Sequence, residues 1–240
     1  MNVIELRQYT LRPGQRDLLI DLFDLEFVES QEALGARVVG QFRDEDNPNR
    51  FVWIRGFSTM QARREALTAF YVEGEVWKAH GPAANATMLD SSDVLLLRPA
   101  GPHSGFPEPA SARPPKGAHT LPSSRVVATI YHLDAPADEE FIRFFSDRVA
   151  PLMAETAGPP LAGFQTEHAE NTFPRLPVRT GENVFVWFSS FADSDHHREH
   201  TERLAQSAEW NESVLPELSA RLSAPPRHLR LAPTARSQLR

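Results

Sequence analysis

Histidines are the side chains of this 240-residue chain whose chemistry best suits proton transfer near neutral pH. His80 and Asn85 lie in the segment VWKAHGPAANATM, where a helix is expected to end. His80 is therefore a candidate general acid or base, or a ligand contact together with Asn85. A histidine at a helix end can also simply bind the free backbone carbonyls there, so both interpretations stay open.

A second histidine group, DSDHHREH, begins the last long helix that the sequence predicts. His196 and His200 are one helical turn apart, which is the spacing of a two-histidine metal face. However, the segment is densely charged, the sequence identifies no third ligand, and the His-Glu-x-x-His order is missing. We therefore interpret the segment as a solvated helix face, and we predict no metal site and no bound cofactor.

The segment NTFPRLPVRTGE combines arginine with an amide and an aromatic side chain. Arg175 and Arg179 are four residues apart and could together hold a carboxylate or phosphate, with Asn171 and Phe173 close by. Loops of this length inside compact domains are often functional, so we expect a ligand-binding loop. The alternative is that the prolines and the glycine of the segment only brace a long hairpin.

The strand sequence RFVWIRGF recurs later in the chain as NVFVWFSSF, with Trp53 and Trp187 in register. Such a repeat indicates that the chain contains the same structural unit twice. A further pair of tryptophans follows the two strands, at Trp77 and Trp210. Paired aromatic residues favour packing in a core or interface. Any pocket that they line would be apolar, with Arg55 among its few polar contacts.

The spacing of apolar residues predicts the same order of elements in both copies. In the first copy, strands are expected at residues 3–11, 36–43, 50–57 and 93–98, with helices at 15–33 and 59–80. This β-α-β-β-α-β order is the ferredoxin-like α+β arrangement, which places two helices on one face of an antiparallel sheet. The other face is bare and must be buried against something.

Residues 100–123 contain many prolines and almost no apolar periodicity, so we predict an extended linker there. The linker divides the chain into two domains at residues 1–99 and 124–234. A loose tail is expected at residues 235–240.

The composition excludes several classes of protein. Because the chain has no cysteine, it has no disulfide framework, no thiolate nucleophile and no sulfur-ligated metal. A net charge of −7 with scattered basic residues argues against nucleic-acid binding. No apolar run approaches the roughly 18 residues of a membrane span, and the first residues do not resemble a signal peptide. We therefore expect a cytoplasmic protein that binds neither nucleic acid nor a membrane.

Four segments together resemble the NIPSNAP family, within the dimeric α+β barrel superfamily. They are IELRQYTLRPG (4–14), GQFRDEDNPNRFVW (40–53), VWKAHGPAANATM (76–88) and AENTFPRLPVRTGENVFVWF (169–188). The resemblance implies tandem NIPSNAP domains, with two ferredoxin-like sheets packed face to face in a barrel. It also allows further pairing of chains into a homo-oligomer. The segment around Phe173 would then be a lid over one barrel mouth.

Family knowledge supplies little chemistry. Animal NIPSNAP proteins are associated with mitochondria and vesicle trafficking, and bacterial members have no settled activity. Neighbouring families in the superfamily include cofactor-independent monooxygenases, haem-degrading enzymes and muconolactone-isomerase-like proteins. Fold-level analogy of this kind is associational.

We expect a small-molecule protein with an apolar pocket inside the barrel. Its polar contacts would come from His80, Asn85, Arg55, Arg175 and Arg179. A small, largely apolar ligand, with or without an anionic group, fits such a pocket. If the protein is an enzyme, a monooxygenase-like or isomerase-like reaction without a bound organic cofactor fits best, with His80 transferring the proton.

The alternative from a different class is a non-enzymatic adaptor or assembly protein that contacts protein partners through its helices. A barrel interior filled with side chains would favour this alternative, as would a large exposed apolar patch. A third hypothesis is haem binding through His80 or His168.

Overall fold

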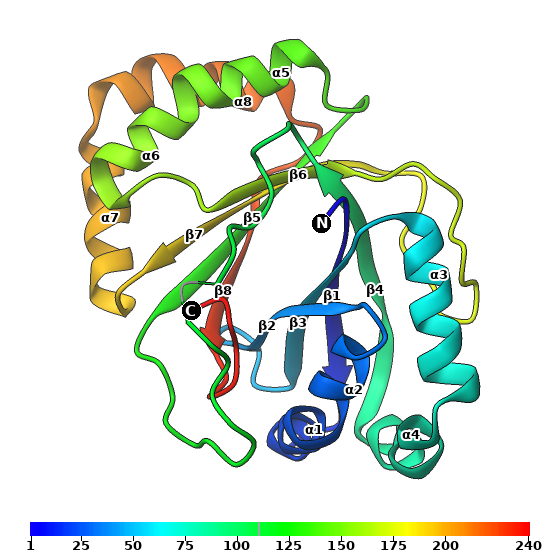
Figure 1. Cartoon of the computed structure of the whole chain (residues 1–240). Coiled ribbons are helices and arrows are strands. Elements are labelled where there is room, and N and C mark those ends of the chain that lie inside the picture. Colours follow the sequence, from blue (N-terminus) through cyan, green and yellow to red (C-terminus); the bar gives the residue numbers. More distant parts are fainter. Residues whose placement is uncertain (110) are drawn as a thin grey trace.

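The computed structural model describes residues 1–109 and 111–240, and in this part of the chain eight strands close into a barrel (Figure 1). Their order around the barrel is β1-β3-β2-β8-β5-β7-β6-β4. The strands of the first half are β1 (Val3–Leu11), β2 (Arg37–Asp44), β3 (Arg50–Phe57) and β4 (Met88–Pro99). Those of the second half are β5 (Arg125–Leu133), β6 (Ala162–Thr166), β7 (Asn183–Phe191) and β8 (Arg227–Pro233).

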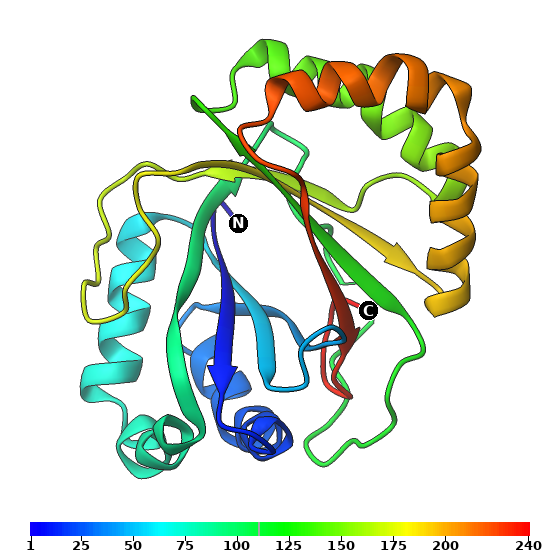
Figure 2. The ribbon, with the colours of Figure 1, turned by 180° about the vertical axis from the view of Figure 1, so that it is seen from behind.

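Helices lie on the outside of the barrel, so the fold is a mixed α+β fold (Figure 2). The helices of the first half are α1 (Arg16–Leu22), α2 (Val28–Glu32), α3 (Met60–Thr68) and α4 (Glu75–Thr87). Those of the second half are α5 (Glu139–Phe144), α6 (Ala150–Ala157), α7 (Ser194–Gln206) and α8 (Leu215–Arg221). Short π-helical segments continue them at η1 (Phe23–Phe27), η2 (Ala69–Glu73), η3 (Phe145–Val149) and η4 (Trp210–Val214).

Side-chain caps fix where several of these helices begin. Thr59, Asp138 and Asp193 each accept a hydrogen bond from the backbone N–H three residues later, at the start of α3, α5 and α7. Among the described residues, none of the helices has the length and apolarity that a membrane crossing requires.

The two halves repeat both the order of elements and the pairing of strands. Each half runs strand, helix, strand, strand, helix, strand, as the sequence predicts. The strands lie side by side as β4-β1-β3-β2 in the first half and as β8-β5-β7-β6 in the second. The halves join where β2 pairs with β8 and β4 pairs with β6. Closure of the barrel therefore leaves no sheet edge unpaired among these strands.

Apolar side chains fill the inside of the barrel. Because successive residues of a strand point to opposite faces, Ile4 and Leu6 of β1 lie inside, whereas Glu5 and Arg7 face the helices. The buried interior cluster also includes Val52, Ile54, Leu95, Leu97, Val126, Ile130, Phe164, Val186, Phe188, Leu229 and Leu231. One cavity, of about 610 Å³, is lined in part by Ile4 and Phe106 of this interior cluster. Two further cavities lie between the outer face of the sheet and the helices, one beside Trp53 and one beside Trp187.

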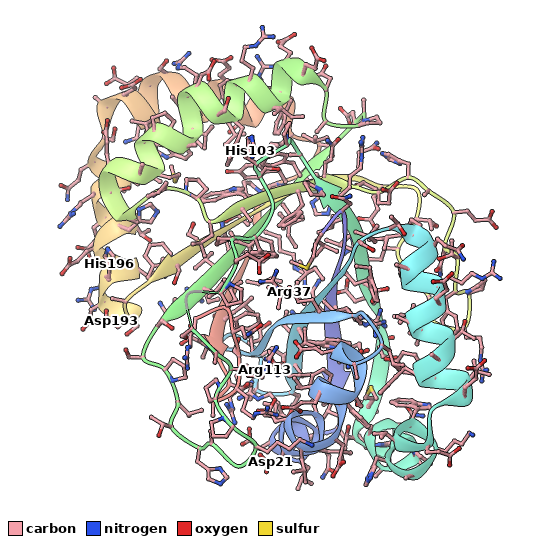
Figure 3. All side chains as sticks on the ribbon, viewed as in Figure 1. Asp21, Arg37, His103, Arg113, Asp193 and His196 are labelled. Carbon is pink, nitrogen blue, oxygen red and sulfur yellow. The ribbon has the colours of Figure 1, made fainter. Side chains whose placement is uncertain are left out.

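The linker at residues 100–123 packs against the barrel. Phe106 joins the interior cluster, with its ring centroid 4.9 Å from the rings of Phe164 and Phe188. Farther along, Arg113, which Figure 3 labels, donates hydrogen bonds to the Glu32 carboxylate at 2.7 Å and to the carbonyl of Val38 at 2.6 Å. The linker thus covers part of the barrel and binds the first half.

The C-terminal tail is also packed, so the expectation of a loose tail at residues 235–240 was wrong. Ala235, Arg236 and Ser237 are buried. The Arg236 guanidinium pairs with Glu29 and with the carbonyl of Asp24. A buried guanidinium needs such partners, and the helical segment that follows β1 supplies them.

Candidate functional site

The helix-facing side of the sheet carries corresponding positions in the two halves, which the strand register identifies. In the first half these positions hold Glu5, Arg7, Trp53 and Arg55. In the second half they hold Val127, Thr129, Trp187 and Ser189. The tryptophan is the same in both, whereas the charged side chains of the first half are replaced by small or neutral ones in the second.

In the first half, the charged side chains form a closed network around Glu5. Its carboxylate accepts hydrogen bonds from Arg7 at 2.7 Å, Arg55 at 2.7 Å and Arg63 at 2.6 Å, and all four side chains are fully buried. Burial alone would raise the pKa of Glu5, but the guanidinium groups, Arg55 foremost, outweigh it and hold that pKa far below its ordinary value. Glu5 is therefore ionised at all ordinary pH values.

Aromatic and amide side chains surround this network. The Arg55 guanidinium lies 4.9 Å from the ring centroid of Trp53 and donates to Gln31 at 2.8 Å and to the Tyr71 hydroxyl at 3.2 Å. Beside them is a cavity of only about 60 Å³, which Asn85 also lines. This space in the first half is thus too small for a typical small-molecule ligand.

The connection between β6 and β7, residues 167–182, closes this side of the first half; we call it the strap. Asn171 accepts a hydrogen bond from Arg63 at 2.9 Å, and the ring of Phe173 lies 6.2 Å from that of Tyr71. Phe173 is buried against residues of the first half. The strap is therefore not a lid over a barrel mouth, as the sequence suggested, but a cover over the outer face of the opposite half.

The two arginines of the strap do not converge on a common site. Arg179 donates to both oxygens of Glu182, at 2.6 and 2.5 Å, and to Asp93 at 3.1 Å. Arg175 is exposed to solvent. Because Arg179 is already paired, the expected carboxylate or phosphate clamp is not formed.

In the second half, the equivalent space is open and forms the candidate site, a cavity of about 490 Å³. Aromatic walls come from Tyr131, Trp187, Phe191 and Trp210. Polar groups come from Thr129, Ser189, His197, His200, His228 and, at the rim, Asp46 and Arg230. A cavity of this size, mostly apolar with a few polar groups, is typical of a small-molecule site.

Loop length explains why this half is uncovered. The structural counterpart of the strap is the short turn between β2 and β3, residues 45–49. This turn reaches only the rim, where Asp46 accepts a hydrogen bond from Arg230 at 3.0 Å. The strap buries Val94 and Leu96 of β4, whereas their counterparts on β8, His228 and Arg230, are exposed.

His197 lies on α7 four residues after the helix cap, as Arg63 does on α3. Its Nδ1 is 3.0 Å from Nη1 of Arg125. Arginine only donates hydrogen bonds, so Nδ1 must accept and the ring proton must be on Nε2. Partial burial, followed by the nearby Arg125 charge, lowers the pKa of His197 to about 4. His197 is therefore neutral at pH 7 and offers an N–H donor.

His200 lies three residues further along the same face of α7 and is 8% exposed. Its Nδ1 is 2.7 Å from the Thr156 hydroxyl, which itself donates to the Leu152 carbonyl at 3.0 Å. When the hydroxyl proton points to the Leu152 carbonyl, Thr156 accepts from Nδ1–H of His200, and this tautomer leaves a lone pair on Nε2. Burial, followed by the neighbouring His196, lowers the pKa of His200, so this ring is also neutral. His197 and His200 thus place a donor and an acceptor side by side.

The other predicted site residues lie apart from this cavity. The His80 side chain is 40% exposed and 3.8 Å from Glu26, and Asn85 is exposed at the end of α4. His168 is exposed on the strap. Of the aromatic candidates, Trp53 belongs to the first-half network and Trp187 to the cavity.

His196 and His200, one helical turn apart, have different hydrogen-bond partners. His196 is at the start of α7 (Figure 3), where its Nδ1 accepts from the backbone N–H of Ala192 at 3.3 Å. In the described part of the chain, no three His, Asp or Glu side chains are grouped so that they could hold a metal ion.

Sequence reasoning missed Thr129, Ser189, His197 and His228, and it considered His200 only as a metal ligand. The sequence did contain a signal that could have identified some of these residues. The repeat that aligns Trp53 with Trp187 also aligns Arg55 with Ser189, and loss of a buried charge in one copy leaves space in that copy. The inference required knowing that this face of the sheet lies under the helices.

Comparisons with known proteins agree with the fold. Residues 4–102 match the NIPSNAP family model. A candidate monooxygenase from Fusobacterium nucleatum is similar over 97% of this chain and 92% of its own, at 10% identity and a TM-score of 0.57. A candidate monooxygenase from Lactobacillus acidophilus has 11% identity and a TM-score of 0.55, covering 97% of this chain and 94% of its own.

An anthrone oxidase-like protein has 13% identity and a TM-score of 0.57, over 97% of this chain and 91% of its own. Identities this low indicate a shared fold only. A search of curated proteins found no match to the sequence.

Proposed function

The first half of this chain belongs to the NIPSNAP family, and from that premise we propose that the protein binds a small, largely apolar molecule in the cavity of its second half. The observation that carries this proposal is the replacement of a buried charged network by a cavity of about 490 Å³ at corresponding positions. The first half maintains the barrel, and the second half supplies the site.

The proposal includes a tandem origin for the two halves. Residues 1–99 and 124–234 would be two ferredoxin-like NIPSNAP units, joined by the linker at 100–123. Support comes from the matching strand orders and from the cross-strand pairs Arg7–Trp53 and Thr129–Trp187. The functional asymmetry then follows from divergence after duplication.

The paired histidines favour a ligand that carries a carbonyl oxygen. His200 Nε2 would take a proton from the carbon beside the carbonyl, while His197 Nε2–H would donate to the oxygen as negative charge develops there. Return of the proton to another carbon gives an isomerase-like reaction. With dioxygen as the oxidant, the enolate carbon forms a C–O bond and, after protonation, a hydroperoxide. If that carbon keeps one hydrogen, cleavage of the O–O bond with loss of that hydrogen gives a second carbonyl group and releases water, which is a monooxygenase-like outcome. The fold likeness to monooxygenase candidates supports this alternative. His200 thus replaces His80 as the candidate base.

Matched ketone and hydrocarbon probes test this proposal. 1-Tetralone and tetralin have nearly the same shape, and quenching of tryptophan fluorescence reports binding beside Trp187 and Trp210. Loss of the proton signal beside the tetralone carbonyl in D₂O, followed by NMR, reports enolisation. We expect both probes to bind and the protein to accelerate exchange.

The variants separate the two candidate bases. His200→Gln should slow the exchange by about 100-fold or more, because it removes the base while keeping a polar side chain. His80→Gln should leave the rate unchanged. Absence of binding by either probe would count against the cavity as a ligand site, and a rate that depends on His80 would restore the sequence-based assignment.

A second candidate function is a non-enzymatic adaptor, which the filled barrel interior favours. Large apolar side chains are exposed on the first-half helices, at Leu18, Leu25 and Val72. If neither probe binds while Leu18→Ser and Leu25→Ser abolish association of the protein with itself or a partner, the adaptor function is the better one. Homo-oligomer formation and a cytoplasmic location stay predictions.

A further inference from the structure

A chain of polar contacts connects the first half of the protein to the cavity of the second. Glu45 lies in the turn after β2, Arg125 begins β5, and His197 lies on α7. Oε2 of Glu45 is 2.6 Å from Nε of Arg125, and Nη2 of Arg125 donates to Oε1 of Glu45 at 3.1 Å. The remaining Nη1 of Arg125 donates to His197 Nδ1 at 3.0 Å.

From this geometry we propose that Arg125 is a positioning residue, held in place by Glu45, that fixes the proton of His197 on the ring nitrogen available to a ligand. This inference rests on the proposed function, because it gives the first half a role in preparing the second-half site. Arg125 contacts the histidine and not the cavity, since it is not among the cavity-lining residues.

Both ends of this contact are constrained. The Arg125 side chain is 16% exposed, so its charge needs a partner, and the ion pair with Glu45, with one hydrogen bond from Nη2, supplies that partner. The turn that carries Glu45 is itself tied to β8, because the Glu45 N–H donates to the Arg230 carbonyl at 2.9 Å. Glu45 is therefore held by backbone contacts that do not depend on Arg125.

Removal of either residue should free the histidine. Without Arg125, Nδ1 loses its donor, and the ring can carry its proton on either nitrogen or become charged. Without Glu45, Arg125 can turn towards solvent. The charged and titratable groups that face His197 are Arg125 on β5, His200 on α7, and His228 and Arg230 on β8. Of these four groups, Arg125 forms the hydrogen bond with the ring of His197.

NMR of the full chain with ¹⁵N-labelled histidine tests the proposal. In the wild-type protein, His197 should be in the Nε2–H form at pH 7 and should titrate near pH 4. In Arg125→Met, a mixture of both tautomers is expected, and the pKa should rise by about 1 or more. Glu45→Gln should shift both properties in the same direction, and Arg125→Lys, which keeps a donor, should restore the Nε2–H form.

Arg37→Met is the matched control, because Arg37 forms a comparable ion pair with Glu108 and contacts no histidine. An unchanged tautomer and titration of His197 in Arg125→Met would overturn the proposal, as would the same change in Arg37→Met. The folded state of each variant is checked by circular dichroism. This result does not depend on a ligand: if 1-tetralone fails to bind the wild-type protein, the proposed function fails, while the titration still decides the role of Arg125.

Discussion

Arg7 and Thr129 occupy the same place on the two halves of the barrel: Arg7 is the cross-strand neighbour of Trp53, and Thr129 is the cross-strand neighbour of Trp187. In the first half, the guanidinium fills the space between sheet and helices and binds Glu5. In the second half, the shorter threonine leaves that space free. One architecture therefore carries a packed charged network on one side and a cavity on the other.

Filling the cavity should weaken ligand binding without unfolding the protein. Ser189 is 8% exposed and lines the cavity, so the ring in Ser189→Phe would occupy space that is empty. We expect the affinity for 1-tetralone to fall by about tenfold or more, which corresponds to about 1.4 kcal/mol of binding free energy. Fluorescence titration measures the affinity, and thermal unfolding checks the fold. Ser92→Phe, at an exposed position of β4, is the control; equal binding by Ser189→Phe would show that the ligand lies elsewhere.

The Glu5 network should be a major determinant of stability. Glu5→Gln removes the carboxylate that neutralises buried arginines, so we expect a loss of about 3–5 kcal/mol in the free energy of unfolding, measured with urea. Because the pKa of Glu5 is lowered in the folded state, its stabilising contribution is complete above its ordinary pKa and is lost as the pH falls towards the folded value. Glu75→Gln, on an exposed side chain, should change little. A small effect of Glu5→Gln would mean that the arginines find other partners.

The strap should stabilise the first half through Phe173 and not through the exposed Arg175. Phe173→Ala removes a buried ring that packs on Tyr71, with an expected loss of about 3 kcal/mol. Arg175→Ala, only two residues away and exposed, should leave the melting temperature nearly unchanged. Calorimetry measures both. If Arg175→Ala instead weakened ligand binding at constant stability, the original assignment of Arg175 to a ligand site would be supported.

The Asp24 carboxyl group, which lies beside the C-terminal tail, should make the free energy of unfolding depend on pH. Burial raises the pKa of Asp24 to about 6, although Arg236 and a hydrogen bond from Gln41 oppose the shift. A carboxyl group whose folded pKa is raised favours folding less as it ionises, so the contribution of Asp24 to stability should fall between about pH 4 and 6 and then level off. The lowered pKa of His197 acts in the opposite direction over the same range, so the Asp24 contribution is read as the difference between the wild-type protein and a variant. Asp24→Asn should remove this decrease and be more stable at pH 7 by about 1–2 kcal/mol after allowance for partial exposure.

Urea unfolding between pH 4 and 8 measures the effect of Asp24. Asp21→Asn, at an exposed position in the preceding helical turn, is the control variant. A parallel pH dependence of the wild-type protein and Asp24→Asn would show that Asp24 does not make this contribution.

The sequence by itself determined that the chain contains a repeat, the order of its elements, and the correspondence of Trp53 in the first copy with Trp187 in the second. Alternation along a strand and helical spacing of apolar residues are local properties, so they can be read without knowing the fold. The NIPSNAP resemblance also rests on local sequence, and the family model that matches residues 4–102 confirmed it for the first half. Local pattern also placed His200 on a helix, but it could not say what that side chain faces.

Only the tertiary structure decided where the cavity of the second half lies. Which face of each strand lies inside the barrel depends on how the two sheets close, and closure placed Ile4 and Leu6 inside and Glu5 and Arg7 under the helices. The path of the strap is likewise non-local, because Phe173 packs on the opposite half. The cavity results from small side chains at positions that are far apart in sequence, such as Thr129 and Ser189, so its volume becomes visible only when the strands are paired.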